Sequence, residues 1–331
     1  MNTEIIKQLA ILIIGFTLLV KGADLFVDGA SGIAKKFGIS ELIIGLTIVA
    51  MGTSAPEAAV SIAAAMKGSA GISIGNVIGS NIMNIFIILG VVAAIVPLKI
   101  KKSTIRYEMP FTILVTVAFV LMGRDGAITR SDGAILWAGL LVYTGYLLKQ
   151  AKQKSPRKSS VPGVEETVAA DRAAETPGNV PEESPSILKL IALTIAGLAV
   201  ILVSSDYAVD AATALARIFN ISDRVIGLTI VALGTSLPEL VTSATAALRG
   251  NADLAVGNVI GSCIFNILFV LVSSALILPI ACAPNFLSDA CVAVGATVLL
   301  LIFGYTGRKI QRWEGWLLLA SYVTYAYVAL V

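Results

Sequence analysis

Two stretches of the chain are nearly identical: GLTIVAMGTSAPE at residues 45–57 and GLTIVALGTSLPE at residues 227–239. A second motif follows each of them at the same distance, GNVIGSNIMNI at residues 75–85 and GNVIGSCIFNI at residues 257–267. With an offset of 182 residues both motifs align without a gap, and about 26 of the 42 positions from 44 to 85 are identical. Random apolar sequence does not give that agreement, so the chain contains an internal duplication.

The composition excludes a soluble domain. Hydrophobic residues make up 57% of the chain and charged residues 14%, whereas a soluble domain carries about 25% charged residues. The apolar residues come in long continuous runs, which are typical of membrane-spanning helices and not of the alternating strands of a barrel. We therefore expect an all-α integral membrane protein. Ten transmembrane helices are predicted, at residues 8–30, 41–66, 72–96, 108–123, 132–150, 187–205 (continuing to about 214), 225–248, 254–279, 289–305 and 314–330.

The stretch at residues 151–186 differs in composition from the rest of the chain. It is rich in Pro, Ser, Glu and Lys, it cannot bury apolar surface, and it is predicted to be a flexible linker. It separates a first repeat of five helices, residues 1–150, from a second at residues 187–331. Because five is odd, the two repeats should enter the membrane from opposite sides. Inverted repeats are typical of secondary transporters, whose ion sites lie near the midplane where the repeats meet.

The placement of basic residues predicts the orientation. If the N-terminus lies outside, the inner loops hold Lys35, Lys36, Lys99, Lys101, Lys102, Arg106, Lys149, Arg249, Arg308, Lys309 and Arg312. The outer loops then hold fewer, namely Lys67, Arg124, Arg130, Arg217 and Arg224. The positive-inside rule therefore favours a protein of the cell (inner) membrane with both termini outside and a cytoplasmic linker. Residues 8–28 lack a cleavage site and are expected to remain as the first span.

Each copy of the first motif places a carboxylate inside the membrane. Glu57 lies about 16 residues into the second predicted span, and Glu239 has the equivalent place in the seventh. An acidic side chain there costs about 2.5–3.5 kcal/mol on insertion scales. Two facing carboxylates also repel each other, so we expect one or both to hold a proton while the site is empty. A bound cation would remove both penalties. The alternative, a carboxylate merely hydrogen-bonded inside the bundle, is disfavoured because the costly residue occurs twice.

The residues around the two carboxylates offer further oxygen ligands. Pro56 and Pro238 cannot donate a backbone hydrogen bond, so the carbonyls of Gly52 and Gly234 lose their partners. The candidate ligands are Thr53, Ser54, Glu57, Ser80, Asn84, Thr235, Ser236, Glu239, Ser262 and Asn266. All supply oxygen, and the chain has no histidine, so the set predicts a site for a hard cation: calcium, sodium or, less well, magnesium. The Ser and Asn residues could instead join helices by hydrogen bonds.

With these motifs the chain resembles the sodium/calcium exchanger family of the cation/calcium antiporter superfamily, of the prokaryotic type with no regulatory domain. The resemblance covers nearly the whole chain, and it implies that the ten residues named above are the ion ligands. It also implies alternating access, with the first and sixth helices sliding as a gating bundle, and electrogenic exchange of several sodium ions for one calcium ion. Many members carry an acidic residue where this chain has Asn266, so the sodium stoichiometry stays open.

The expected function is therefore that of a secondary active antiporter for Na⁺ and Ca²⁺, not of an enzyme. A proton/calcium antiporter would use the same carboxylates, and a passive cation channel is a third possibility, which broken helices and inverted repeats disfavour. A membrane-embedded hydrolase would need an activated nucleophile or a metal-bound water, and the absence of histidine from the chain disfavours it. We expect no cofactor, no nucleic acid and no obligate protein partner beside inorganic cations and the lipid bilayer.

Four aspartates and three cysteines also lie in or beside the predicted spans. Asp24, Asp28, Asp206 and Asp210 form i, i+4 pairs in the first and sixth spans, and they either line ion access paths or lie near an interface. Cys263, Cys282 and Cys291 show no CxxC spacing, so they are predicted to be free thiols.

Overall fold

The computed structural model describes residues 2–68, 70–154, 185–219, 232–282 and 286–330, and nearly all of them are helical. In the first half the helices are α1 (Asn2–Phe37), α2 (Glu41–Ile44), η1 (Gly45–Val49), α3 (Ala50–Thr53), α4 (Ala55–Met66), α5 (Ala70–Met83), η2 (Asn84–Leu89), α6 (Gly90–Ile95), η3 (Thr104–Glu108), α7 (Met109–Met122), η4 (Gly123–Asp125) and α8 (Arg130–Lys154). In the second half they are α10 (Ile187–Ile218), α12 (Ala232–Thr235), α13 (Leu237–Leu248), α14 (Ala252–Phe265), η6 (Asn266–Leu271), α15 (Val272–Ile277), α16 (Phe286–Gly307) and α17 (Arg312–Leu330).

The helices are those of a multi-pass membrane protein. Within the described part of the chain, 7 helices are long and apolar enough to cross a membrane, and the bent pair Glu41–Thr53 and Ala55–Met66 would make 8. The sequence predicts ten. The seventh predicted span, 225–248, begins in residues outside the described ones. The tenth, 314–330, is helix α17, whose Arg312 and Glu314 lower its apolar character.

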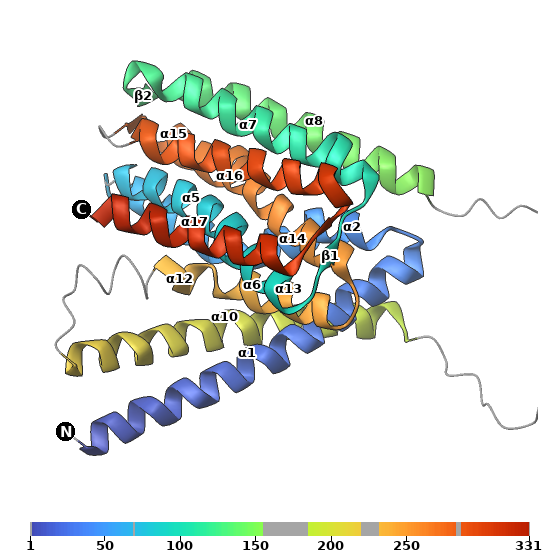
Figure 1. The fold of residues 1–331 in the computed structure, drawn as a ribbon, viewed down its shortest axis with the longest axis vertical. Coiled ribbons are helices and arrows are strands. Elements are labelled where there is room, and N and C mark those ends of the chain that lie inside the picture. The colour runs from blue at the N-terminus through green and yellow to red at the C-terminus, as the bar shows by residue number, and fades with distance from the viewer. Residues whose placement is uncertain (1, 69, 155–184, 220–231, 283–285, 331) are drawn as a thin grey trace, which may run out of the picture.

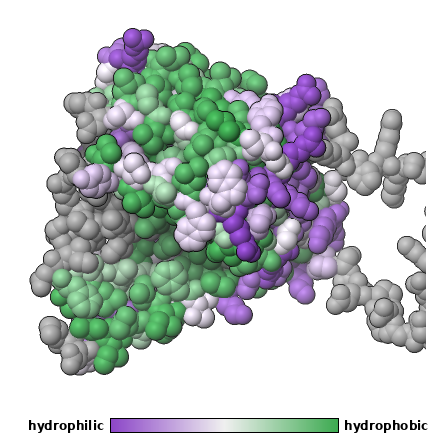
Figure 2. Space-filling model, in the orientation of Figure 1, coloured by the Kyte–Doolittle hydropathy of each residue, from purple (hydrophilic) through white to green (hydrophobic). Residues whose placement is uncertain are grey.

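The surface suits a lipid environment. Figure 2 shows hydrophobic side chains over most of the visible face, with hydrophilic side chains gathered at one end. At that end α8 stops and α10 begins, and we call it the linker end. The N- and C-termini lie together at the opposite end (Figure 1), which we call the terminal end.

The second predicted span is broken where its glutamate lies. The segments Glu41–Thr53 and Ala55–Met66 meet at an angle of 48°, and Ser54 between them has φ −82° and ψ 12°. Pro56 in the first turn of α4 has no N–H to donate to the preceding turn, which accounts for the break. The second half repeats the arrangement, with Ser236 at φ −93° and ψ 4° followed by Pro238. Glu57 and Glu239 therefore both lie in the first turn after a break.

Four strands of two residues each join the halves. They are β1 (Leu98–Lys99), β2 (Ala127–Ile128), β3 (Ile280–Ala281) and β4 (Lys309–Ile310). Strand β1 pairs with β4, and β2 pairs with β3, both antiparallel. The offset of 182 residues places β1 on β3 and β2 on β4, and it converts the pair Leu98↔Ile310 into Ile280↔Ile128. Strands β1 and β2 lie at opposite ends of the bundle (Figure 1).

The long helices α1 and α10 lie side by side along one flank of the bundle (Figure 1). Glycine allows their backbones to come close: a Cβ atom on Gly29 would lie 2.4 Å from Thr194 Oγ1. Such small residues at a helix contact are common in membranes. At the centre of the fold, α14 is buried along its length. A Cβ atom on Gly257 would lie 2.8 Å from the Leu42 carbonyl, so this glycine of the second motif serves packing.

Candidate cation site

The two glutamates of the repeated motif meet between the halves of the chain. Each is 1% exposed. Ser54 Oγ donates a hydrogen bond to Glu239 Oε1 at 2.8 Å, and Ser236 Oγ donates to Glu57 Oε1 at 3.2 Å. Each break thus supplies a hydroxyl to the carboxylate of the other half. Ser54 is three residues before Glu57 in the chain, yet its hydroxyl bonds to Glu239 of the other half.

The remaining predicted ligands lie around this pair. The side chain of Thr235 interacts with the Glu57 carboxylate, and that of Thr53 with Glu239. The Thr53 hydroxyl also lies 3.0 Å from Asn258 Oδ1. On the next helix of each half, the remaining predicted residues are all buried: Ser80, Asn84, Ser262 and Asn266.

Several oxygen atoms of these residues are buried without a donor. Among the described residues no hydrogen-bond partner reaches Oε2 of Glu57, Oε2 of Glu239, Oδ1 of Asn84 or Oδ1 of Asn266. Leaving one such group buried and unsatisfied costs about 1–3 kcal/mol. The two amide oxygens can only accept, and the two carboxylate oxygens do so when they are ionised, so a cation is the natural partner for the set. Carboxylate, amide and hydroxyl oxygens are the ligands that calcium and sodium prefer.

Local helix geometry contributes at two of these positions. Asn84 and Asn266 each begin a π-helical stretch, η2 and η6. Such stretches disturb the regular i to i−4 hydrogen-bond pattern and occur frequently at functional sites. No sequence pattern that we used predicts them.

Two asparagines hold the backbone behind the carboxylates. Asn76 Nδ2 donates to the Glu57 carbonyl at 3.1 Å and to Ser61 Oγ at 2.9 Å. Asn258 Nδ2 donates to the Glu239 carbonyl at 3.5 Å and to Ser243 Oγ at 3.0 Å. Neither asparagine is among the ligands predicted from the sequence. The signal was present, because both Asn and both Ser recur at the offset of 182 residues.

One neighbour of the site breaks the symmetry between the halves. Asn81 in the first half corresponds to Cys263 in the second, and Asn81 Nδ2 donates to the Cys263 carbonyl at 3.1 Å. Asn266 Nδ2 donates to Asn81 Oδ1 at 3.1 Å. This hydrogen bond orients the Asn266 amide, and no described donor reaches Asn266 Oδ1. Cys263 is a free thiol, as predicted, and so are Cys282 and Cys291.

The charge of the site comes from two carboxylates. Within the described residues, no three side chains of His, Cys, Asp or Glu gather as a metal cluster. The four aspartates of the first and sixth spans do not join the site. Asp24 and Asp28 pair with Arg249, while Asp206 and Asp210 are exposed.

Known proteins are similar to this chain over most of its length. The family model described as sodium/calcium exchanger protein matches residues 7–149 and 189–331. The sodium/calcium exchanger MaX1 of Methanosarcina acetivorans is 35% identical, over 96% of this chain and 97% of MaX1. The inner membrane protein YrbG of Escherichia coli is 39% identical, over 82% of this chain and 80% of YrbG. A solved structure of the sodium-calcium exchanger NCX_Mj superposes with a TM-score of 0.80 at 34% identity, covering 99% of this chain and 100% of that one.

Proposed function

This chain belongs to the sodium/calcium exchanger protein family, and we propose that it is a secondary active antiporter that exchanges Na⁺ for Ca²⁺ by alternating access. The observation that carries the proposal is the pair of buried carboxylates, Glu57 and Glu239, each with one oxygen that no donor reaches from the described part of the chain. The proposed ligands are Thr53, Ser54, Glu57, Ser80, Asn84, Thr235, Ser236, Glu239, Ser262 and Asn266.

Competition between the two ions provides the coupling. Calcium and sodium need the same carboxylate oxygens, so occupancy by one excludes the other. Two negative charges balance one calcium ion. An empty site with both carboxylates ionised would carry uncompensated charge through a medium of low dielectric constant, which is costly. If that species does not cross between the two orientations, each calcium ion moved one way requires sodium moved the other way.

The proposed architecture is two inverted repeats of five helices, at residues 1–150 and 187–331, with the linker 151–186 between them. The strand register supports it: the offset that exchanges the halves converts one small sheet into the other, and the two sheets lie at opposite ends of the bundle (Figure 1). We place the linker end in the cytoplasm of the cell and both termini outside, because the linker end carries Lys35, Lys36 and Lys189 among its basic residues.

The test is radioactive calcium uptake into proteoliposomes loaded with sodium. Uptake driven by the outward sodium gradient is expected, and Glu57→Gln should abolish it because the neutral amide removes half of the fixed charge. Glu314→Gln is the matched control, since Glu314 is also buried but lies outside the site. Full activity in Glu57→Gln would refute the site assignment.

A second set of vesicles tests the alternative coupling ion. A proton/calcium antiporter would use the same two carboxylates as proton carriers. Vesicles that hold a pH gradient and no sodium should show no uptake if sodium is the coupling ion. Uptake under the pH gradient alone would leave the site in place and move the protein to the proton-coupled branch. Calcium flux that needs no counter-ion would indicate a channel.

A further inference from the structure

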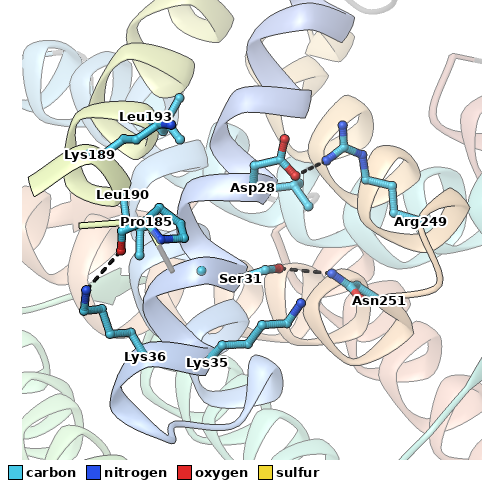
Figure 3. A pocket seen from close by; sticks show the side chains of 12 residues that line it. Asp28, Ser31, Lys35, Lys36, Pro185, Lys189, Leu190, Leu193, Arg249 and Asn251 are labelled. Carbon is cyan, nitrogen blue, oxygen red and sulfur yellow. Dashed lines mark hydrogen bonds and ion pairs between the residues drawn. The ribbon is translucent and has the colours of Figure 1, made fainter. Parts of the chain in front are cut away.

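An ion pair at the linker end ties the second glutamate helix to α1. Arg249 caps the C-terminal end of α13. Its Nη2 lies 2.6 Å from Asp24 Oδ1, and its Nη1 pairs with Asp28. Figure 3 shows the contact with Asp28, in the wall of a cavity of about 820 Å³ formed by the end of α1, the start of α10 and the turn after α13. Beside it, Asn251 Nδ2 donates to Ser31 Oγ at 3.0 Å.

The duplication places the same three charges at the terminal end. At an offset of 182 residues, Lys67 corresponds to Arg249, Asp206 to Asp24 and Asp210 to Asp28. Lys67 caps α4 as Arg249 caps α13. Both are followed by a glycine in the left-handed region, Gly68 at φ 78° and Gly250 at φ 81°. The turns are therefore equivalent, and so are their cations.

The two equivalent groups differ in their contacts. Lys67, Asp206 and Asp210 are described and exposed, and none of the ion pairs found among the described residues joins them. The exposure of one equivalent side chain beside each group differs in the same way. Ser31, beside the formed pair, is 6% exposed, whereas its equivalent Thr213 on α10 is only half-buried. Among the described residues, an ion pair to the turn after α13 thus joins one end of the α1–α10 pair to the bundle, and no ion pair joins Lys67 to Asp206 or Asp210 at the other end.

From this asymmetry we infer that the four aspartates form two alternating ionic latches. Arg249 with Asp24 and Asp28 closes the linker end in the state described here. Lys67 with Asp206 and Asp210 closes the terminal end in the opposite state. The inference rests on the proposed alternating access and assigns a role to four acidic residues that lie away from the cation site. Transport would require one latch to open before the other forms.

The strength of the pair suits a device that must open in every cycle. The side chains are 34% exposed at Arg249, 31% at Asp24 and 58% at Asp28. Partly exposed ion pairs contribute little, so loss of this latch should shift the ratio of the two states by about three- to tenfold. Moving a population from nearly all one state to nearly all the other takes about 10⁴-fold. The latch therefore biases the states without trapping either.

The experiment measures access to each end directly. In a full-length protein with Cys263, Cys282 and Cys291 replaced by Ala, a single reporter is introduced by Ser31→Cys at the linker end or Thr213→Cys at the terminal end. The rate of reaction with a bulky polar maleimide is measured on purified protein. Arg249→Gln should raise the rate at position 31 about three- to tenfold and lower it at position 213. Lys67→Gln should change both rates in the opposite directions.

Controls separate opening of the latch from a change in thiol reactivity. Removing a nearby positive charge should slow a thiol, and removing nearby negative charges should speed it. The double variant Asp24→Asn with Asp28→Asn should nevertheless act in the same direction as Arg249→Gln, because both open the latch. Lys35→Gln removes a cation of the same cavity that makes no ion pair with any residue the structure describes, and it should leave the ratio of the two rates unchanged.

Two outcomes have distinct meanings. If wild-type protein shows sodium-driven calcium uptake and Arg249→Gln leaves both labelling rates unchanged, the latch is wrong and the proposed function stands. If the rates shift in opposite directions but uptake follows a pH gradient alone, the latch stands and the proposed coupling ion is wrong.

Discussion

At the scale of single residues, the candidate site combines two carboxylates with two neutral asparagines. Asn84 and Asn266 occupy equivalent positions, and each has a buried Oδ1 without a donor. Their amide nitrogens differ, because Asn266 Nδ2 donates to Asn81 Oδ1. An aspartate at position 266 would therefore face the acceptor Asn81 Oδ1. In the other half, the residue equivalent to Asn81 is Cys263, so an aspartate at position 84 would not face an asparagine oxygen.

This difference predicts the effect of a third charge. Asn84→Asp should strengthen calcium binding by at least about tenfold, because unit charges about 4 Å apart interact with about 4 kcal/mol at an effective dielectric constant of 20. Asn266→Asp should give a smaller gain, because it loses the hydrogen bond to Asn81 and leaves two acceptors facing each other at a cost of about 1–3 kcal/mol. Calcium titration calorimetry in sodium-free buffer measures both. Equal gains would show that the Asn81 contact has no energetic role.

At the scale of elements, the break in each glutamate helix decides where the carboxylates meet. Pro56→Ala restores a backbone donor and should allow α3 and α4 to straighten. The Ser54 hydroxyl would then leave Glu239, and sodium-driven calcium uptake should fall more than about tenfold. The protein itself should unfold at the same or a higher temperature. Pro110→Ala is the matched control, because Pro110 also lies in the first turn of a helix, α7, but away from the site. Unchanged uptake in Pro56→Ala would contradict the role of the break.

The sequence predicts these elements to different degrees. Long apolar runs predict where the spans lie, and Pro56 and Pro238 predict the two breaks, because proline acts locally. The π-helical stretches and the two-residue strands follow from packing across the bundle, which leaves no local pattern. The pairing of Ser54 with Glu239 also depends on how the halves face each other. Asn76 and Asn258 were predictable from recurrence, but their role as backbone anchors appears only once α5 lies against α4 and α14 against α13.

At the scale of the whole molecule, the two halves differ in which end of the bundle carries a formed ion pair. The described state has its formed ion pair at the linker end and its open equivalent at the terminal end. If the linker end is cytoplasmic, this is the state closed to the cytoplasm. The positive charges favour that orientation, since the linker end includes Lys35, Lys36 and Lys189 around one cavity (Figure 3).

Fusions in a bacterial host test the orientation. Alkaline phosphatase, which is active only outside the cytoplasm, should be active when fused after Val331 and inactive when inserted between residues 151 and 186. A fluorescent protein that matures only in the cytoplasm should give the reverse pattern at the same two positions. A reversed result would keep the cation site and both latches, because neither depends on the sign of the membrane. It would change which latch must open for cytoplasmic calcium to reach Glu57 and Glu239: the formed pair at Arg249 would then face outward, and the described state would be the one open to the cytoplasm.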